Sequence, residues 1–475
     1  MIAAAGPTSR ARFAVAVAAL GAIALGGCAS FSADGGFGAV EQVATERLGK
    51  EVRWARDDAA RTAIDERVAA LLDAPLSADD AVQVALLNNR GLQAAFAELG
   101  ITEAELVQAG RLPNPGFSFG RFRRGDETEI ERGLHLSLAR LVAMPMVREM
   151  EGRRFERAKR DAALAALSLA ADTRKAWVAA VAAEESVRYT RQVRDASDAS
   201  AELARRMARA GNWNKLQQAR EQGFYADAAL GLARAERMRD AARERLTRLM
   251  GLWGEQTGFR LPERLPELPE APDAVPDVER RALAQRLDVQ AARLGVEQTA
   301  KNLGLTRTTR FVNVLELGLV RNSSNDAPTQ RGWEIEFELP LFDWAGARVA
   351  RAEAIYMQAL NRAAQVAIDA RSEVREAYGA YRSAFDIARH HRDEIVPIRN
   401  RIAEENLLRY NGMLIGVFEL LADARAQIAA VNGYIEALRE FWIAQADLEL
   451  ALIGRPSLPM PAAASAAAPA TGAAH

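Results

Sequence analysis

The sequence is poor in the residues that build reactive or metal-binding sites. It contains one cysteine and four histidines in 475 residues, and only 6% of its residues are aromatic. His390 and His391 are adjacent, so on a helix their side chains would point about 100° apart and could not chelate one ion together. No spaced cluster of His, Cys or Met and no glycine-rich phosphate loop stands out. The sequence therefore predicts no metal site and no cofactor, and no Ser, His and Asp constellation points to an enzyme.

The chain also lacks a dominant charge and, beyond its N-terminus, a long hydrophobic run. Lys and Arg number 62 against 63 Asp and Glu, a balance that argues against a nucleic-acid partner. After Cys28 no apolar run approaches the roughly 18 residues that indicate a transmembrane helix. A mature chain that crosses a membrane would have to close β-strands into a barrel. Abundant alanine and few aromatic residues favour long, closely packed helices.

The N-terminus has the pattern of a signal peptide over residues 1–27. Arg10 and Arg12 form a positive start, and Phe13 to Leu25 supply an apolar segment of about 13 residues. The following Leu25-Gly26-Gly27-Cys28 resembles the lipobox of bacterial lipoproteins, in which the cysteine is acylated, for example with palmitate. Because Cys28 is the only cysteine, it cannot form an internal disulfide. We expect a lipid anchor at Cys28; a chance cysteine in an ordinary signal peptide is the alternative.

The segments Gly91-Leu92-Gln93-Ala94-Ala95 and Asp288-Val289-Gln290-Ala291-Ala292 are similar and lie about 200 residues apart, which predicts a duplicated unit. Each unit is expected to hold an opening helix, at about 78–110 and 278–305, then a strand pair and two long helices. The expected boundaries are 28–77 for a lipidated segment with a helix, 78–251 for the first repeat (strands about 114–123 and 129–141, long helices 147–250), 252–277 for a proline-rich linker, 278–455 for the second repeat (strands about 310–320 and 332–341, long helices 345–453), and 456–475 for a disordered tail.

The segment Gly332–Asp343 alternates apolar and polar residues with a period of two. On a strand, apolar side chains would share one face and acidic side chains the other, namely Trp333, Ile335 and Phe337 against Glu334, Glu336 and Glu338. Glu316 and His135 alternate with leucines of their own strands in the same way. One face suits lipid and the other water. A soluble two-layer sheet would alternate identically, so the pattern leaves both interpretations open.

The long helices need extended partners. About 64 residues from Val147 to Ala210 would span about 95 Å as a helix. In the last helix, apolar residues recur every seven positions, at Leu421, Ile428, Ile435 and Trp442. A sustained heptad predicts a left-handed coiled coil, although a soluble helical bundle gives the same pattern.

Several motifs together resemble the outer-membrane efflux channels of the TolC family over about residues 40–455. They are Asn88-Asn89-Arg90, Leu112-Pro113-Asn114-Pro115, Leu339-Pro340-Leu341-Phe342-Asp343 before a helix, and Tyr410 with Gly412. The resemblance implies a mainly α fold with a small membrane β part, in which three copies of four strands form a twelve-stranded barrel above a periplasmic helical barrel. It further implies a homotrimer in the outer membrane that serves tripartite efflux or type I secretion with a periplasmic adaptor (membrane fusion) protein and an inner-membrane transporter.

The first repeat departs from this pattern after its strand pair. Fourteen residues separate Leu138 from Gly152, with Met144-Pro145-Met146 between them, against seven between Leu339 and Gly346. We therefore expect an irregular passage from strand to helix over 139–152.

The resemblance places adaptor docking and gating at two helix-to-helix turns. These contain Gly211 and Asn212, and Gly412 and Gly416, residue types that tight turns favour. Beyond the second turn, Glu419 and Asp423 are spaced to share a helix face. Three copies would bring these carboxylates together and attract cations, whereas a solvated helix face is the alternative. His135, Glu316, Glu334, Glu336 and Glu338 are expected to line the barrel lumen.

A second class of function remains open from the sequence: a lipid-anchored periplasmic coiled-coil scaffold or adaptor whose strand pairs form a small soluble domain. Adaptors need a lipoyl-like or barrel domain, and the sequence shows no such pattern. Drugs, metal ions and secreted proteins use ducts of similar shape, so the sequence does not select a cargo.

Overall fold

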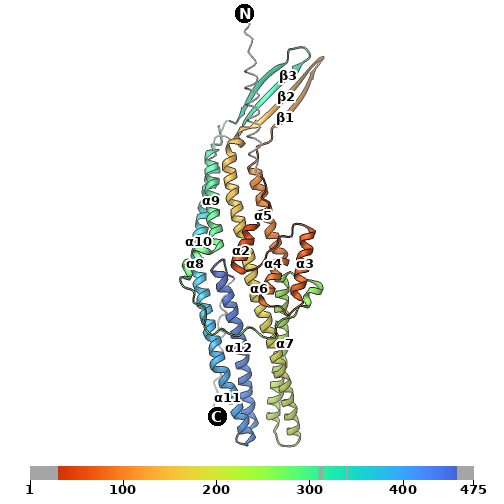
Figure 1. The fold of residues 1–475 in the computed structure, drawn as a ribbon, viewed down its shortest axis with the longest axis vertical. Helices are drawn as coiled ribbons and strands as arrows, with labels where there is room; N and C mark the ends of the chain where they lie inside the picture. Colours follow the sequence, from red (N-terminus) through yellow and green to blue (C-terminus); the bar gives the residue numbers. More distant parts are fainter. Residues whose placement is uncertain (1–29, 310–313, 339–340, 457–475) are drawn as a thin grey trace. The chain divides into compact units, whose positions relative to one another are not determined.

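The computed structural model describes residues 30–309, 314–338 and 341–456 (Figure 1). The predicted signal peptide, Cys28, Leu339, Pro340 and residues 457–475 of the predicted tail lie outside the described residues. The chain forms two compact units, each assembled from three separate segments. Two long helices, α6 (Leu138–Arg209) and α10 (Gly346–His390), run from the first unit into the second.

The first unit comprises Met1–Trp54, Arg90–Ala166 and Leu287–Ala367. Besides the initial parts of α6 and α10, it contains α2 (Gly38–Leu48), α5 (Arg90–Ala109), α9 (Leu287–Thr308) and all four strands. The ring of Phe37 packs 5.0 Å from that of Phe96 and 6.1 Å from that of Trp54, measured between centroids. These contacts bury the start of α2 against α5.

The four strands form one antiparallel sheet in the order β1 (Gly116–Arg124), β2 (Glu127–Ser137), β3 (Leu315–Ser324) and β4 (Gln330–Phe337). Central strands β2 and β3 come from different repeats and pair from Glu129 opposite Ser324 to Ser137 opposite Glu316. Asn325 joins the two hairpins, because its side chain accepts a 2.8 Å hydrogen bond from the Thr128 N–H and donates one of 2.8 Å to the Asp126 carbonyl. The two repeats therefore build a single sheet.

The second unit comprises Ala55–Asn89, Leu167–Arg286 and Ile368–His475. Its elements are α3 (Asp58–Leu72), α4 (Ala78–Asn88), α7 (Lys215–Met250), the 3₁₀ turn η1 (Gly254–Gly258), α8 (Val278–Gln285), the π-helical turn η2 (His391–Ile395), α11 (Val396–Asn411) and α12 (Val417–Ala451). In its core, the Phe441 ring lies 5.5 Å from Tyr381 and 5.8 Å from Phe385. The heptad residue Ile435 is buried in the same core, as is Leu438.

The prediction of an irregular passage from strand to helix over 139–152 is wrong. α6 begins at Leu138, directly after the last residue of β2, and continues for 72 residues with Pro145 inside it. An interior proline removes one backbone hydrogen bond and costs about 3 kcal/mol. The flanking Leu, Ala, Arg and Met residues are strong helix formers, and their helix propensity within this long helix offsets the cost of Pro145.

Both opening helices are broken where the sequence suggests one continuous helix. Asn89 separates α4 from α5, and Arg286 separates α8 from α9, each with extended backbone. Asn88 donates to the carbonyls of Met250 and Gly251, at 3.1 and 2.8 Å, and so caps the end of α7. The long helix expected from residue 345 is likewise interrupted by η2, next to Pro397 at the start of α11.

Candidate functional site

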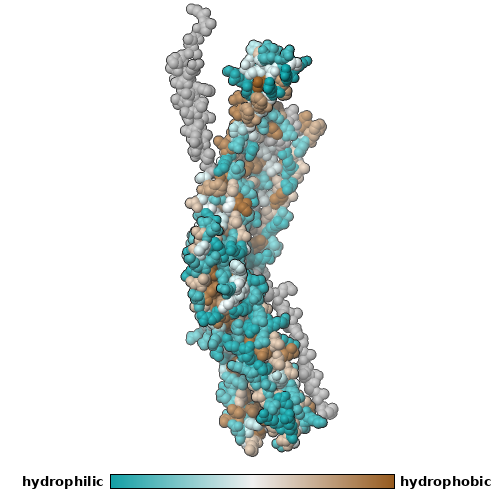
Figure 2. Space-filling model, turned by 90° about the vertical axis from the view of Figure 1, so that its right-hand side faces the viewer, coloured by the Kyte–Doolittle hydropathy of each residue, from teal (hydrophilic) through white to brown (hydrophobic). Residues whose placement is uncertain are grey.

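The two faces of the sheet differ sharply in chemistry. On one face, Phe117, Leu134, Leu319 and Trp333 stand side by side across the four strands, because each is paired with the next in the register. Trp333 is 70% exposed and Phe117 is 69% exposed. Figure 2 shows hydrophobic surface of this kind below a hydrophilic outer end of the sheet. An exposed apolar face of this extent marks a surface that contacts lipid or another protein.

The opposite face carries the residues predicted for a lumen. His135 stands opposite Gly318, which stands opposite Glu334, and Glu316 stands opposite Glu336. Glu338 follows β4 and is exposed. The structure therefore brings His135, Glu316, Glu334 and Glu336 together on one surface, and the carboxylates give that surface a negative charge.

A hydrogen-bonded network on this face was not expected from the sequence. His135 Nε2 lies 2.9 Å from Ser118 Oγ, and its Nδ1 lies 3.2 Å from Glu334 Oε1. Two glycines provide the space: a Cβ at Gly133 would lie 2.4 Å from Ser118 Oγ, and one at Gly318 would lie 2.6 Å from Glu334 Cγ. The alternation marked His135 and Glu334 separately, but only the register shows that they meet across Gly318.

The first helix-to-helix turn has the conformation expected of it. α6 ends at Arg209, and Gly211 adopts a left-handed backbone with φ of 78°. Asn214 then caps α7 by accepting a 2.8 Å hydrogen bond from the Gln217 N–H, while the Gln217 side chain accepts one of 2.9 Å from the Asn214 N–H. This capping box starts α7 sharply after the turn.

The second turn differs from the expectation. Gly412 has φ of −81°, and the left-handed residue is Met413, with φ of 59°. Gly416 is extended and precedes α12. Met413 is 93% exposed and Leu414 is 77% exposed, so this turn presents two large apolar side chains to solvent. A non-glycine residue at positive φ is uncommon and costs energy, which marks the turn as a candidate contact site.

The two candidate tip carboxylates are not equivalent. Glu419 is exposed at the start of α12, whereas Asp423 is half-buried and accepts a hydrogen bond from the Asn406 side chain of α11. Asp423 therefore joins α11 to α12, and Glu419 is the more accessible of the pair.

A buried carboxylate near the first turn was missed by sequence reasoning. Glu221 on α7 is 1% exposed and accepts from Ser200 Oγ on α6 at 2.9 Å. The Arg425 guanidinium of α12 donates to Glu221 at 3.2 Å and lies 4.1 Å from the centre of the Phe224 ring. This Glu221–Arg425 link connects the hairpin of α6 and α7 to α12. Only the packing of distant helices brings these residues together.

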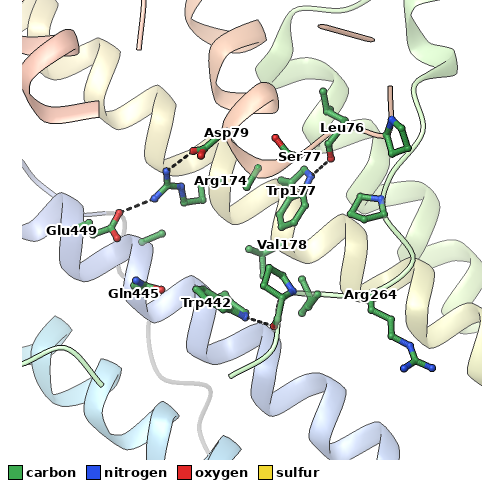
Figure 3. Close-up of a pocket in the computed structure, with 16 residues that line it drawn as sticks. Leu76, Ser77, Asp79, Arg174, Trp177, Val178, Arg264, Trp442, Gln445 and Glu449 are labelled. Carbon is green, nitrogen blue, oxygen red and sulfur yellow. Dashed lines mark hydrogen bonds and ion pairs between the residues drawn. The ribbon is translucent and has the colours of Figure 1, made fainter. Parts of the chain in front are cut away.

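The second unit also has an open pocket of about 560 Å³, lined by α4, α6, α12 and the proline-rich segment (Figure 3). Trp177 donates to the Leu76 carbonyl at 2.8 Å, and Trp442 donates to the Pro266 carbonyl at 3.0 Å. Arg174 bridges Asp79 and Glu449 at its rim, at 3.2 and 3.0 Å. Burial raises the pKa of the Glu449 carboxyl, and Arg174 opposes that rise. The bond from Trp442 holds the proline-rich linker against α12.

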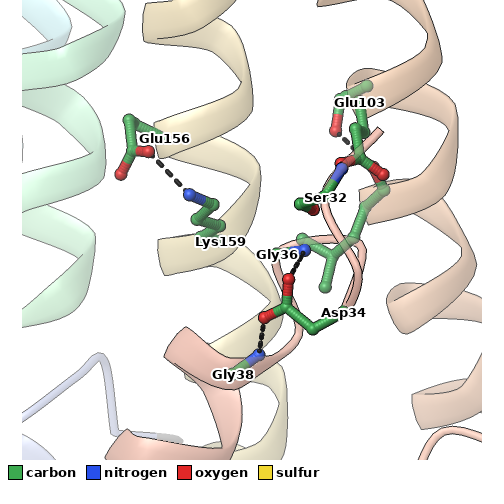
Figure 4. A network of polar contacts seen from close by, with 9 residues as sticks. Ser32, Asp34, Gly36, Gly38, Glu103, Glu156 and Lys159 are labelled. Atoms are coloured by element: carbon green, nitrogen blue, oxygen red, sulfur yellow. Dashed lines mark hydrogen bonds and ion pairs between the residues drawn. The ribbon is translucent and has the colours of Figure 1, made fainter. Parts of the chain in front are cut away.

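The first described residues are held by a polar network in the first unit (Figure 4). The Ser32 N–H donates to Glu103 on α5 at 2.6 Å, and Glu103 is nearly buried. Asp34 accepts from the N–H groups of Gly38 and Gly36 at 2.8 and 3.1 Å, and these bonds lower the pKa of its carboxyl. The chain that follows Cys28 is therefore fixed to the first unit from Ser32 onward.

No helix in the described part of the chain is both long and apolar enough to span a membrane. Among the described residues, no group of three or more His, Cys, Asp or Glu side chains is arranged to hold a metal ion. No family model matches the sequence.

A duplicated pair of long helical hairpins joined to one four-stranded antiparallel sheet is the fold of outer-membrane channels, as the resemblance to the TolC family predicted. The outer membrane channel CmeC of Campylobacter jejuni superposes with a TM-score of 0.69 and 18% identity, over 79% of this chain and 85% of CmeC. The open-state outer membrane channel MtrE of Neisseria gonorrhoeae gives a TM-score of 0.66 and 19% identity, over 79% of this chain and 88% of MtrE.

In sequence, the chain is similar to the cobalt-zinc-cadmium resistance protein CzcC of Cupriavidus metallidurans. The two are 26% identical over 283 residues, which make up 57% of this chain and 64% of CzcC. The chain thus matches less than two thirds of the length of this relative.

Proposed function

We propose that this protein is an outer-membrane exit duct, a passive homotrimeric channel that serves a tripartite efflux or type I secretion system. The observation that carries the proposal is the two-faced sheet, with an exposed apolar face on one side and His135, Glu316, Glu334 and Glu336 on the other. Four strands have open edges, and three copies would close them into a barrel with lipid outside and carboxylates inside. The fold shared with known channels supports the same conclusion.

The proposal assigns the helical turns to the periplasmic end of the duct. Gly211, Asn212, Gly412 and Gly416 shape these turns, and the exposed Met413 and Leu414 offer apolar contacts to a periplasmic adaptor. Glu419 would face the closed tip. An inner-membrane transporter would supply the energy and select the cargo. The acidic lumen favours cations, and CzcC is by name a resistance protein for cobalt, zinc and cadmium.

Conductance tests this proposal directly. Protein purified from the outer-membrane fraction is expected to migrate as a heat-labile trimer and to produce stepwise, cation-selective currents in a planar bilayer, because carboxylates line its proposed lumen. A soluble monomer after osmotic shock, or trimers that never conduct, would instead favour a lipid-anchored periplasmic scaffold or adaptor.

Lipid attachment at Cys28 is a separate part of the proposal. In cells fed labelled palmitate, the Cys28→Ser variant is expected to lose all label, because a serine hydroxyl does not replace the acylated thiol. Ser32→Ala is the matched control and should keep the label, since Ser32 contacts Glu103 and carries no lipid. Normal labelling of Cys28→Ser would refute the anchor.

A further inference from the structure

Five arginines occupy the outer end of the sheet, on the apolar face. From the helices toward the hairpin turns, this face presents Phe337 opposite Leu315, then Ile335 with Leu317 and Leu136, then Trp333 with Leu319, Leu134 and Phe117. The next row contains Arg331, Arg321, Arg132 and the exposed Phe119. Farther out on β1, Arg121 lies opposite Ile130 and Arg123 opposite Thr128. We call these five arginines the arginine row.

The central three arginines stand directly beside one another. Arg132 is paired with Arg321, and Arg321 with Arg331. Residues paired across strands have Cβ atoms about 4.5–5.5 Å apart, and like charges there repel. The acidic residues of the same strands, Glu129 and Glu131, point to the other face because side chains alternate. Within the described residues, no ion pair joins the arginine row to a carboxylate.

The row lies beyond the apolar rows, on the side of the sheet away from the helices. The distance along β4 from Phe337 to Arg331 is about 20 Å at 3.4 Å per residue, which is about 15 Å along the membrane normal for strands tilted by 35–45°. The apolar band of an outer-membrane barrel is about 25 Å tall, so the long arginine side chains have to extend outward from the row to reach headgroups. α6 leaves the sheet at the opposite end, directly after β2, so the row and the hairpin turns are distal to the helices. With the helices in the periplasm, the row would face the outer leaflet.

We propose that the arginine row binds the phosphate groups of the phosphorylated glycolipid in the outer leaflet, the lipid A part of lipopolysaccharide. This inference rests on the proposed function, since it requires the apolar face to contact lipid. A guanidinium binds phosphate oxygens through two parallel hydrogen bonds, and several guanidiniums beside one another match a bisphosphorylated headgroup. A bound phosphate would also relieve the repulsion within the row.

Lipid binding to the purified trimer tests the inference. Native mass spectrometry would follow titration with bisphosphorylated lipid A and with its dephosphorylated form, each in mixed micelles. The wild type is expected to bind the bisphosphorylated form at least tenfold more tightly. The triple variant Arg132→Gln, Arg321→Gln, Arg331→Gln should lose at least tenfold in affinity for this form, and the corresponding lysine variant should retain part of it. Excess inorganic phosphate should compete only weakly, because it lacks the acyl chains.

The matched control changes three exposed helical arginines, Arg245, Arg382 and Arg401, to glutamine, which alters the net charge equally and should leave lipid binding unchanged.

Equal binding of the two lipid forms by the wild type would overturn the inference even if the triple variant failed to fold. Wild-type affinity in a folded triple variant would overturn it as well. Conductance of the same preparations separates the two proposals: conducting trimers without phosphate preference contradict the lipid site alone, whereas phosphate-dependent binding without conductance contradicts the duct.

Discussion

Replacing Ile335 by arginine is expected to abolish trimers in the outer membrane. Ile335 lies opposite Leu317 in the middle of the apolar rows and is 49% exposed. An arginine at the bilayer midplane of a barrel costs about 2–4 kcal/mol, and a homotrimer meets this cost three times. The heat-labile trimer band of the outer-membrane fraction and bilayer conductance both measure the effect.

The neighbouring residue provides a matched control. Glu336→Arg introduces the same side chain one position along β4, on the carboxylate face opposite Glu316. This variant should still form conducting trimers, with cation selectivity reduced because an acid has become a base. Normal trimer yield from Ile335→Arg would show that the apolar face does not contact lipid, and the proposed barrel would be wrong.

Replacing Glu221 by glutamine is expected to loosen the helical tip. The change leaves the Arg425 guanidinium without its carboxylate partner and weakens the bond from Ser200. Removing one partner of a buried charged pair is destabilising, and the partial exposure of Arg425 limits the loss to about 1–3 kcal/mol. The variant should therefore show a higher mean single-channel conductance and a lower denaturation midpoint than the wild type.

Glu202→Gln provides the comparison for Glu221→Gln. Glu202 is a partly exposed carboxylate on α6 that pairs with Arg205 and Arg206 of its own helix, at 2.7 and 2.9 Å. Losing these surface pairs within one helix should leave conductance unchanged. If Glu221→Gln and Glu202→Gln conduct alike, the Glu221–Arg425 link does not hold the tip.

The secondary structure of this protein was largely readable from local patterns. Alternation at Trp333 to Phe337 identified a two-faced strand, and the heptad from Leu421 to Trp442 identified a long packed helix, because each pattern reports which side of an element is buried. The helix breaks at Asn89 and Arg286 could not be predicted from local sequence patterns. Asn88 caps a helix that ends 162 residues later in the chain, at Met250, and no local signal announces such a contact.

The candidate site was only partly predictable for the same reason. Glycines and asparagines located both turns, but the left-handed residue of the second turn is Met413, where surrounding structure overrides local preference. The missed carboxylate Glu221 has no distinguishing neighbours in the sequence. Its burial and its partner Arg425 come from a helix that lies about 200 residues away along the chain.

By itself, the sequence determined the duplication, the helical character and the strand faces, because composition and periodicity act through neighbouring residues. The lipid anchor at Cys28 stays a prediction. The tertiary structure decided which strands pair and in what register. That register alone places Arg132, Arg321 and Arg331 in one row and joins Ser118, His135 and Glu334 across two glycines. A shift of one residue would turn every side chain to the other face, so such juxtapositions arise from the whole sheet and cannot be read from any single strand.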